Sequence, residues 1–246
     1  MLHPIPSRAT IFSVVLLSVA FSLAIHYANP VPYSLALGLP LIVLGILIRL
    51  VTNSMLKKNQ LVCRDGPYAF CRHPMYVGTI SLGTGIALAL NHPLALALLA
   101  VAVAISIYRI RKEEGYLVAK LPDYAAYRRE VPAFPTPGSV IRAFRSGRVR
   151  QPLSLKQCFR NGEVFRMNLY LPLILAAGLY LQRTGKLDVP DAALVAGALV
   201  LLLLTAASFR LHPGKSRRKR RDYLVPVMLE LGILIPAALA IPTWTS

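Results

Sequence analysis

A histidine–proline pair and an acidic pair are the residues of this chain best suited to bind a small charged ligand. His73 and Pro74 begin one apolar stretch, and Glu113 and Glu114 follow the end of the next. A turn at 91–93 folds the second stretch back beside the first, so both pairs are expected at the same end of a hairpin. The whole chain has only 10 acidic residues, which makes an adjoining pair notable.

Each of these residue types can bind a charged group of a ligand. Glu113 or Glu114 can accept charge-assisted hydrogen bonds from an ammonium. His73 and the N–H groups at the start of a helix can donate to a carboxylate. Arg109 lies four residues before Glu113, on the same helix face. It can orient a carboxylate or phosphate by a bidentate contact.

Each feature also has a simpler structural explanation. Pro74 is favoured in the first turn of any helix, and Gly66-Pro67-Tyr68 is a common turn sequence. The acidic pair can end a solvated helix, although a carboxylate there opposes the helix dipole and calls for a longer helix or a cationic partner. The small residues of the first stretch either pack against another helix or line a ligand site; they are Gly78, Ser81, Gly83 and Gly85.

The composition indicates a membrane protein that must position these residues with helices. Hydrophobic residues make up 55% of the 246 residues and charged ones 15%, against about 25% charged in soluble domains. We predict an all-α, polytopic transmembrane bundle. About seven apolar blocks approach the length of a membrane span, at residues 9–28, 33–51, 75–90, 93–108, 167–182, 192–209 and 223–241.

The distribution of charge predicts the topology. The net charge is +18, and the basic residues concentrate at 53–74, 109–166 and 210–222. This alternation places the N-terminus and the candidate site in the cytoplasm, and it explains the charge without a nucleic-acid partner. The first block lacks a clear cleavage site, so we expect a retained helix. The cysteines show no metal-binding or disulfide spacing; they are Cys63, Cys71 and Cys158.

A Pro-rich and then Arg-rich stretch suggests how the chain is divided. We predict a four-helix core with a ligand-binding cytoplasmic segment at 1–134, a basic cytoplasmic connection at 135–166, and a three-helix transmembrane region at 167–246. Glu230 lies inside the last block, where an ionisable residue is a functional candidate by default. The sequence leaves the oligomeric state and the role of the rear helices open.

Residues 66–134 resemble the isoprenylcysteine carboxyl methyltransferase and phospholipid N-methyltransferase superfamily of integral membrane enzymes. The resemblance rests on GPYAFCRHPMYVG at 66–78, GTG at 83–85 and RIRKEE at 109–114. Leu117, Tyr124, Tyr127, Val131, Pro132 and Phe134 extend it. It implies an S-adenosylmethionine-dependent methyltransferase. The implied cofactor-binding residues are Gln60, Leu61, Val62, Cys63, Tyr68, His73, Pro74, Met75, Tyr76, Gly83, Gly85, Glu113 and Glu114, with Asn53 as an outlying contact.

The resemblance also implies a lipophilic methyl acceptor, with Arg109 facing it. A carboxylate acceptor is already nucleophilic at neutral pH, whereas an amine would need a base such as Glu114 or a lipid phosphate. A prenylated cysteine, an aminophospholipid, a phenol and a thiol all remain possible. The alternatives are an NADPH-dependent sterol-type reductase and a transporter or scaffold built around Glu230. The sequence has no glycine-rich βαβ loop of the Rossmann type.

Overall fold

The computed structural model describes residues 16, 19–56, 62–149, 152–154, 157–158, 174, 177–178, 180–182 and 184–186. The regular structure of these residues is entirely helical, which confirms the all-α class for this part of the chain. Residues 192–209 and 223–241, most of 167–182 and nearly half of 9–28 lie outside it, so the count of about seven spans stays a prediction. The chain divides into two compact units, Met1–Arg49 with Arg64–Val149, and Leu50–Cys63 with Arg150–Ser246. The three-part division and the orientation of the N-terminus also stay predictions.

Two described helices are long and apolar enough to cross a membrane: α2 (Pro32–Met55) and α5 (Pro93–Lys120). Helix α2 extends one turn beyond the expected span at 33–51. Helix α4 (Pro74–Leu90) is apolar but shorter, with 17 residues.

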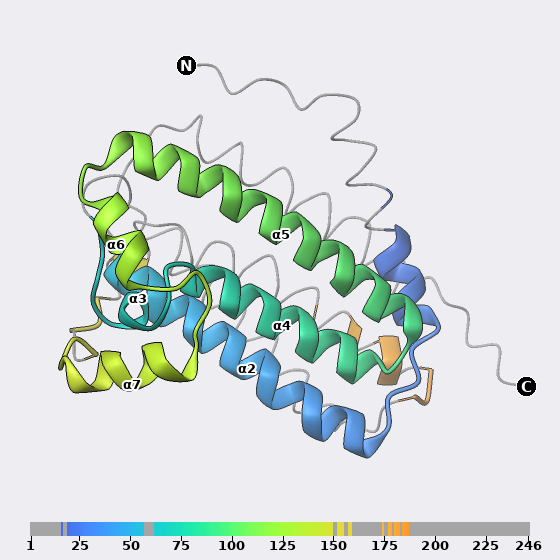
Figure 1. The fold of residues 1–246 in the computed structure, drawn as a ribbon. Helices are drawn as coiled ribbons and strands as arrows, with labels where there is room; N and C mark the ends of the chain where they lie inside the picture. The colour runs from blue at the N-terminus through green and yellow to red at the C-terminus, as the bar shows by residue number, and fades with distance from the viewer. Residues whose placement is uncertain are drawn as a thin grey trace, which may run out of the picture. The chain divides into compact units, whose positions relative to one another are not determined.

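Helices α4 and α5 form the expected hairpin, and local residue chemistry explains its turn (Figure 1). Asn91 ends α4 in the left-handed conformation, with φ of 48°, which asparagine tolerates better than most residues. The His92 ring accepts a hydrogen bond from the Leu94 N–H at 3.2 Å. Pro93 then occupies the first turn of α5, where its fixed φ favours a helix.

Helix α5 continues well past residue 108, where its apolar block ends. It runs to Lys120, twelve residues farther, or about 18 Å at the usual helical rise. Residues 109–120 are mostly Arg, Lys, Glu, Leu and Ala, which favour helix. The acidic pair therefore lies within a helical extension beyond the apolar segment.

Close backbone contacts join α2 to α4 through glycines spaced seven apart on both helices. A Cβ atom on Gly85 would lie 2.6 Å from the Gly38 carbonyl oxygen, and one on Gly45 would lie 2.6 Å from that of Gly78. Ser81 donates a hydrogen bond to a backbone carbonyl of α2 at 2.9 Å. The small residues of α4 thus pack against a neighbouring helix, one of the two roles expected for them.

Three short helices gather near the extension of α5: α3 (Pro67–Phe70), α6 (Tyr124–Glu130) and α7 (Pro137–Arg145) (Figure 1). Gly66 precedes α3 with φ of 62°, a conformation that favours glycine. The buried Tyr127 hydroxyl donates to the Tyr68 carbonyl oxygen at 2.8 Å. These contacts hold α3 immediately before the start of α4.

In the second unit, the C-terminal end of α2 is buried against residues 157–158. The Gln157 side-chain amide donates to the Leu56 carbonyl oxygen at 2.9 Å. The Cys158 thiol donates to the Leu50 carbonyl oxygen at 3.2 Å. Asn53, the outlying residue of the predicted site, is fully buried here.

Candidate active site

Glu114, on the extension of α5, is the centre of a buried ion-pair cluster. Its Oε1 accepts hydrogen bonds from Arg72 Nε at 2.8 Å and from His73 Nε2 at 3.0 Å. Arg72 Nη2 lies 2.7 Å from the same oxygen, and Arg128 Nε of α6 lies 3.2 Å from Oε2. Glu114 is only 7% exposed. The structure thus brings His73 and the acidic pair together, as the hairpin predicts.

Backbone pairing holds Arg72 and His73 in position at the start of α4. The Arg72 N–H donates to the Pro132 carbonyl oxygen at 2.8 Å, and the His73 N–H to that of Ala133 at 3.2 Å. The Arg72 guanidinium also donates to the Arg128 carbonyl oxygen at 2.9 Å. The segment that follows α6 therefore fixes both residues against Glu114.

Glu114 is held as an anion. Burial alone would raise the pKa of the Glu114 carboxyl, but hydrogen bonds from His73 and Arg72 and their charges outweigh it and lower that pKa below its ordinary value. Four donor contacts leave its oxygens little capacity for another donor, and a lowered pKa makes it a weak general base. The proposed roles of Glu114 as ligand and base stay predictions, and the geometry favours a positioning role.

The neighbouring Glu113 is placed differently. It is exposed, and the Tyr76 hydroxyl donates to its Oε2 at 3.2 Å. Its Oε1 accepts no hydrogen bond from the described residues. The Tyr76 ring also packs edge-on against His73, with 5.9 Å between centroids. Glu113 therefore has an oxygen available to a ligand beside an aromatic ring.

Arg109 and Tyr124 complete the polar groups at this end of the hairpin. Arg109 is exposed, one turn before Glu113, and forms no ion pair with a described residue. Tyr124 is only 4% exposed, yet its hydroxyl has no hydrogen-bond partner among the described residues. Burial, and then the charge of Glu114, raise the pKa of Tyr124 to about 12. The hydroxyl therefore stays protonated and can donate.

The other predicted contacts fall into three groups. Pro74 and Tyr68 are buried and Met75 is partly exposed, all close to the cluster in sequence. Gly85 faces α2, and a Cβ on Gly83 would lie 3.2 Å from a Leu99 methyl group of α5, so packing accounts for both glycines. The predicted strip before the cluster is only partly described: Val62 and Cys63 are half-buried in the second unit, and Gln60 and Leu61 lie outside the described residues.

Sequence reasoning did not identify Arg72 and Arg128 as partners of Glu114. Arg72 was given no partner, because nothing in its spacing points to a residue 42 positions away. The unfavourable position of a carboxylate near a helix end was the available signal. Such a carboxylate calls for a longer helix or a cationic partner. The structure shows both, because α5 continues to Lys120 and Arg72 pairs with Glu114. Tyr124 entered the sequence analysis only as one position of the family resemblance, and no role was predicted for its hydroxyl.

Comparisons with known proteins connect this geometry to a family. Residues 43–119 match the model of the isoprenylcysteine carboxyl methyltransferase (ICMT) family. The chain is 39% identical over 84 residues to the cobalt-zinc-cadmium resistance protein CzcN of Cupriavidus metallidurans, covering 32% of this chain and 37% of the relative. It is 36% identical over 86 residues to the protein-S-isoprenylcysteine O-methyltransferase of Schizosaccharomyces pombe, covering 34% and 36%. The chain thus spans little more than a third of these relatives. No solved structure matches it.

Proposed function

We propose that this chain is an integral membrane methyltransferase, because residues 43–119 match the model of the isoprenylcysteine carboxyl methyltransferase family and its sequence is similar to a relative of that name. It uses S-adenosylmethionine to methylate a lipophilic acceptor at the cytoplasmic face of a multi-pass helical bundle. The observation that carries the proposal is the meeting of Arg72 and His73 with Glu114, beside Tyr76 and Glu113, at one end of the α4–α5 hairpin.

The described residues fit the polar groups of this cofactor, with Glu113 rather than Glu114 as the main acidic ligand. Glu113 is exposed and has an oxygen available for an ammonium group. The Tyr124 hydroxyl is a buried donor that no described residue accepts from, and it is suited to a carboxylate or ribose oxygen. The Tyr76 ring offers an aromatic surface beside Glu113. His73 is bonded to Glu114 through Nε2, so that atom orients Glu114.

The chain mainly positions the reactants. When bound, S-adenosylmethionine supplies a methyl group already activated by its sulfonium, so positioning provides much of the rate enhancement. Arg109 orients an anionic group of the acceptor, since its exposed guanidinium can form a bidentate contact. The lowered pKa of Glu114 argues against it as a base for an amine. The site therefore favours an acceptor that is already anionic, such as a carboxylate.

The direct test is to incubate the purified full-length protein with methyl-labelled cofactor and a total membrane extract, and to identify the labelled product. We expect a labelled lipophilic product that is lost in Glu113→Gln. Glu130→Gln is the matched control, because the Glu130 side chain is 52% exposed and, among the described residues, pairs only with Arg64 at a long 3.7 Å, a contact that contributes little. A wild-type protein that neither binds the cofactor nor labels any product would refute the proposal.

A further inference from the structure

Helix α7 presents two chemically different strips beside the face that it buries. Ser139 and Ala143 face inward, with 4% and 2% of their surface exposed. Ile141 and Phe144 are 52% and 63% exposed and lie three positions apart, so they form one apolar strip. Arg142 and Arg145 have the same spacing and form a basic strip on the adjoining side.

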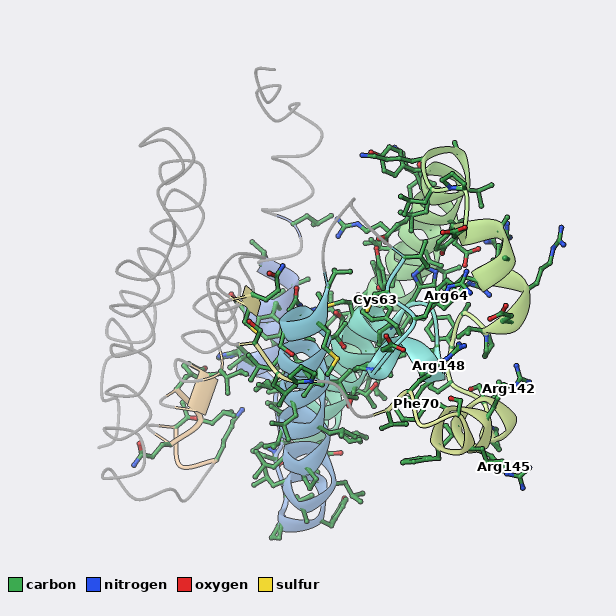
Figure 2. The ribbon with its side chains drawn as sticks, turned by 90° about the vertical axis from the view of Figure 1, so that its left-hand side faces the viewer. Cys63, Arg64, Phe70, Arg142, Arg145 and Arg148 are labelled. Carbon is green, nitrogen blue, oxygen red and sulfur yellow. The ribbon has the colours of Figure 1, made fainter. Side chains whose placement is uncertain are left out.

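Helix α7 is firmly attached to the first unit. A capping box stabilises its start, with the Ser139 N–H donating to Thr136 Oγ1 at 3.2 Å and the Thr136 N–H donating to Ser139 Oγ at 3.0 Å. Phe144 also packs against Phe70 of α3, with 5.6 Å between ring centroids. Figure 2 shows Phe70 beside α7, with Arg142 and Arg145 projecting outward. The two exposed strips are therefore held in a fixed orientation.

The position of α7 places these strips near the N-terminal end of apolar α4. Helix α3 ends at Phe70, four residues before apolar α4 begins at Pro74. Four residues span at most about 14 Å, so α3 and the helix packed on it lie close to the N-terminal end of this apolar helix. Exposed aromatic and aliphatic side chains next to arginines are typical of helices that lie in the membrane interface.

The positive charge around α7 favours anionic lipids. No acidic residue occurs between residues 131 and 162. Arg145 and Arg148 are exposed and form no ion pair with a described residue. Arginines at an interface attract anionic headgroups. We propose that α7 lies in the membrane interface, inserting Ile141 and Phe144 below the headgroups and binding anionic lipids through Arg142, Arg145 and Arg148. This proposal does not depend on methyl transfer.

A tryptophan reporter in the full-length protein can test both parts of the proposal. The chain has one tryptophan, so Phe144→Trp in a Trp244→Phe background gives a single indole on α7. The protein is reconstituted into vesicles that contain brominated phosphatidylcholine or brominated phosphatidylglycerol. We expect strong quenching by both lipids and a clear preference for phosphatidylglycerol. Tyr116→Trp in the same background is the control, because Tyr116 is exposed on the extension of α5 beyond the apolar segment; quenching there should be weak.

Charge variants separate apolar insertion from lipid recognition. Adding Arg142→Gln and Arg145→Gln should leave quenching by phosphatidylcholine unchanged and reduce the phosphatidylglycerol preference by about fivefold per arginine. Arg142→Lys with Arg145→Lys should retain the preference. Equal quenching by the two lipids in the unmodified background would overturn the headgroup assignment. An indole at position 144 that acrylamide quenches and brominated lipid does not would overturn the insertion and indicate a soluble partner for this face.

Discussion

Replacing each of the two adjacent glutamates by glutamine should have different effects: Glu114→Gln should mainly lower stability, and Glu113→Gln should mainly weaken cofactor binding. Glu114→Gln removes the charge that compensates Arg72, whose side chain is only 10% exposed. Losing one partner of a buried ion pair costs about 3–5 kcal/mol. The lower end applies here, because Arg72 keeps its hydrogen bonds to two backbone carbonyls, and Arg128 is 52% exposed and contributes little. In Glu113→Gln an exposed amide can still accept from Tyr76, so its effect on stability should stay within about 0.5 kcal/mol.

Thermal unfolding of the detergent-solubilised protein, followed with a thiol-reactive dye, can measure this difference. Cys71 is buried beside the cluster, and burial raises the pKa of its thiol to about 11, so it should react only after unfolding. A loss of about 3 kcal/mol lowers Tm by roughly 6–12 °C in a chain of this size. Glu114→Gln should show this shift, and Glu113→Gln should stay near the wild-type Tm.

Cofactor binding should be affected more by Glu113→Gln than by Glu114→Gln. Glu113→Gln removes a charged acceptor for the ammonium group, and a hydrogen bond to a charged group contributes about 1.5–3 kcal/mol. The Kd for S-adenosylmethionine should therefore rise roughly 10- to 100-fold. Glu114→Gln, measured below its own Tm, should change that Kd less. Equal melting temperatures for the two variants, or a stronger binding defect in Glu114→Gln, would refute the division of roles between these glutamates.

Three further substitutions or conditions test other parts of the site. Arg109→Ala should lower turnover of the acceptor at least tenfold and leave the cofactor Kd unchanged; equal loss of both would contradict its role toward the acceptor. Gly85→Ala should destabilise the protein because its Cβ would lie 2.6 Å from a backbone oxygen of α2, whereas Gly115→Ala, which meets nothing within 4 Å, should be neutral or stabilising by about 0.5–1 kcal/mol. Since the folded-state pKa of Glu114 is below the ordinary 4.5, its contribution to stability is complete above that pH and is lost as pH falls. Between pH 7 and pH 3 the Tm should therefore decrease more for wild type than for Glu114→Gln. An equal decrease in Tm for the two proteins would contradict a stabilising charge on Glu114.

The hairpin could be predicted from sequence because local signals specify it. Proline marks the first turn of α4 and of α5, and Asn91 adopts the conformation that ends a helix. Folding back then brings His73 near the acidic pair, whatever the rest of the chain does. The end of α5 was less predictable, because apolar content stops at residue 108 while helix propensity continues to Lys120.

The ion-pair cluster could not be predicted in detail, because it depends on tertiary pairing. Arg72, Glu114 and Arg128 come from three segments, and only the packed structure selects their partners among the 28 basic residues of the chain. The glycines show the same limit. Their seven-residue spacing on α2 and on α4 is visible in the sequence, but the register that places Gly38 against Gly85 is not.

The pairing of residues 72–73 with residues 132–133 also fixes the order in which the protein can be assembled. A nascent chain can complete the α4–α5 hairpin once residue 120 has been synthesised. The amides of Arg72 and His73 acquire their carbonyl partners only after the segment that follows α6 has been synthesised. Biogenesis should therefore pass through a stage in which the α4–α5 hairpin is complete and the amides of Arg72 and His73 still lack these partners. Their pairing waits for about a dozen more residues of synthesis.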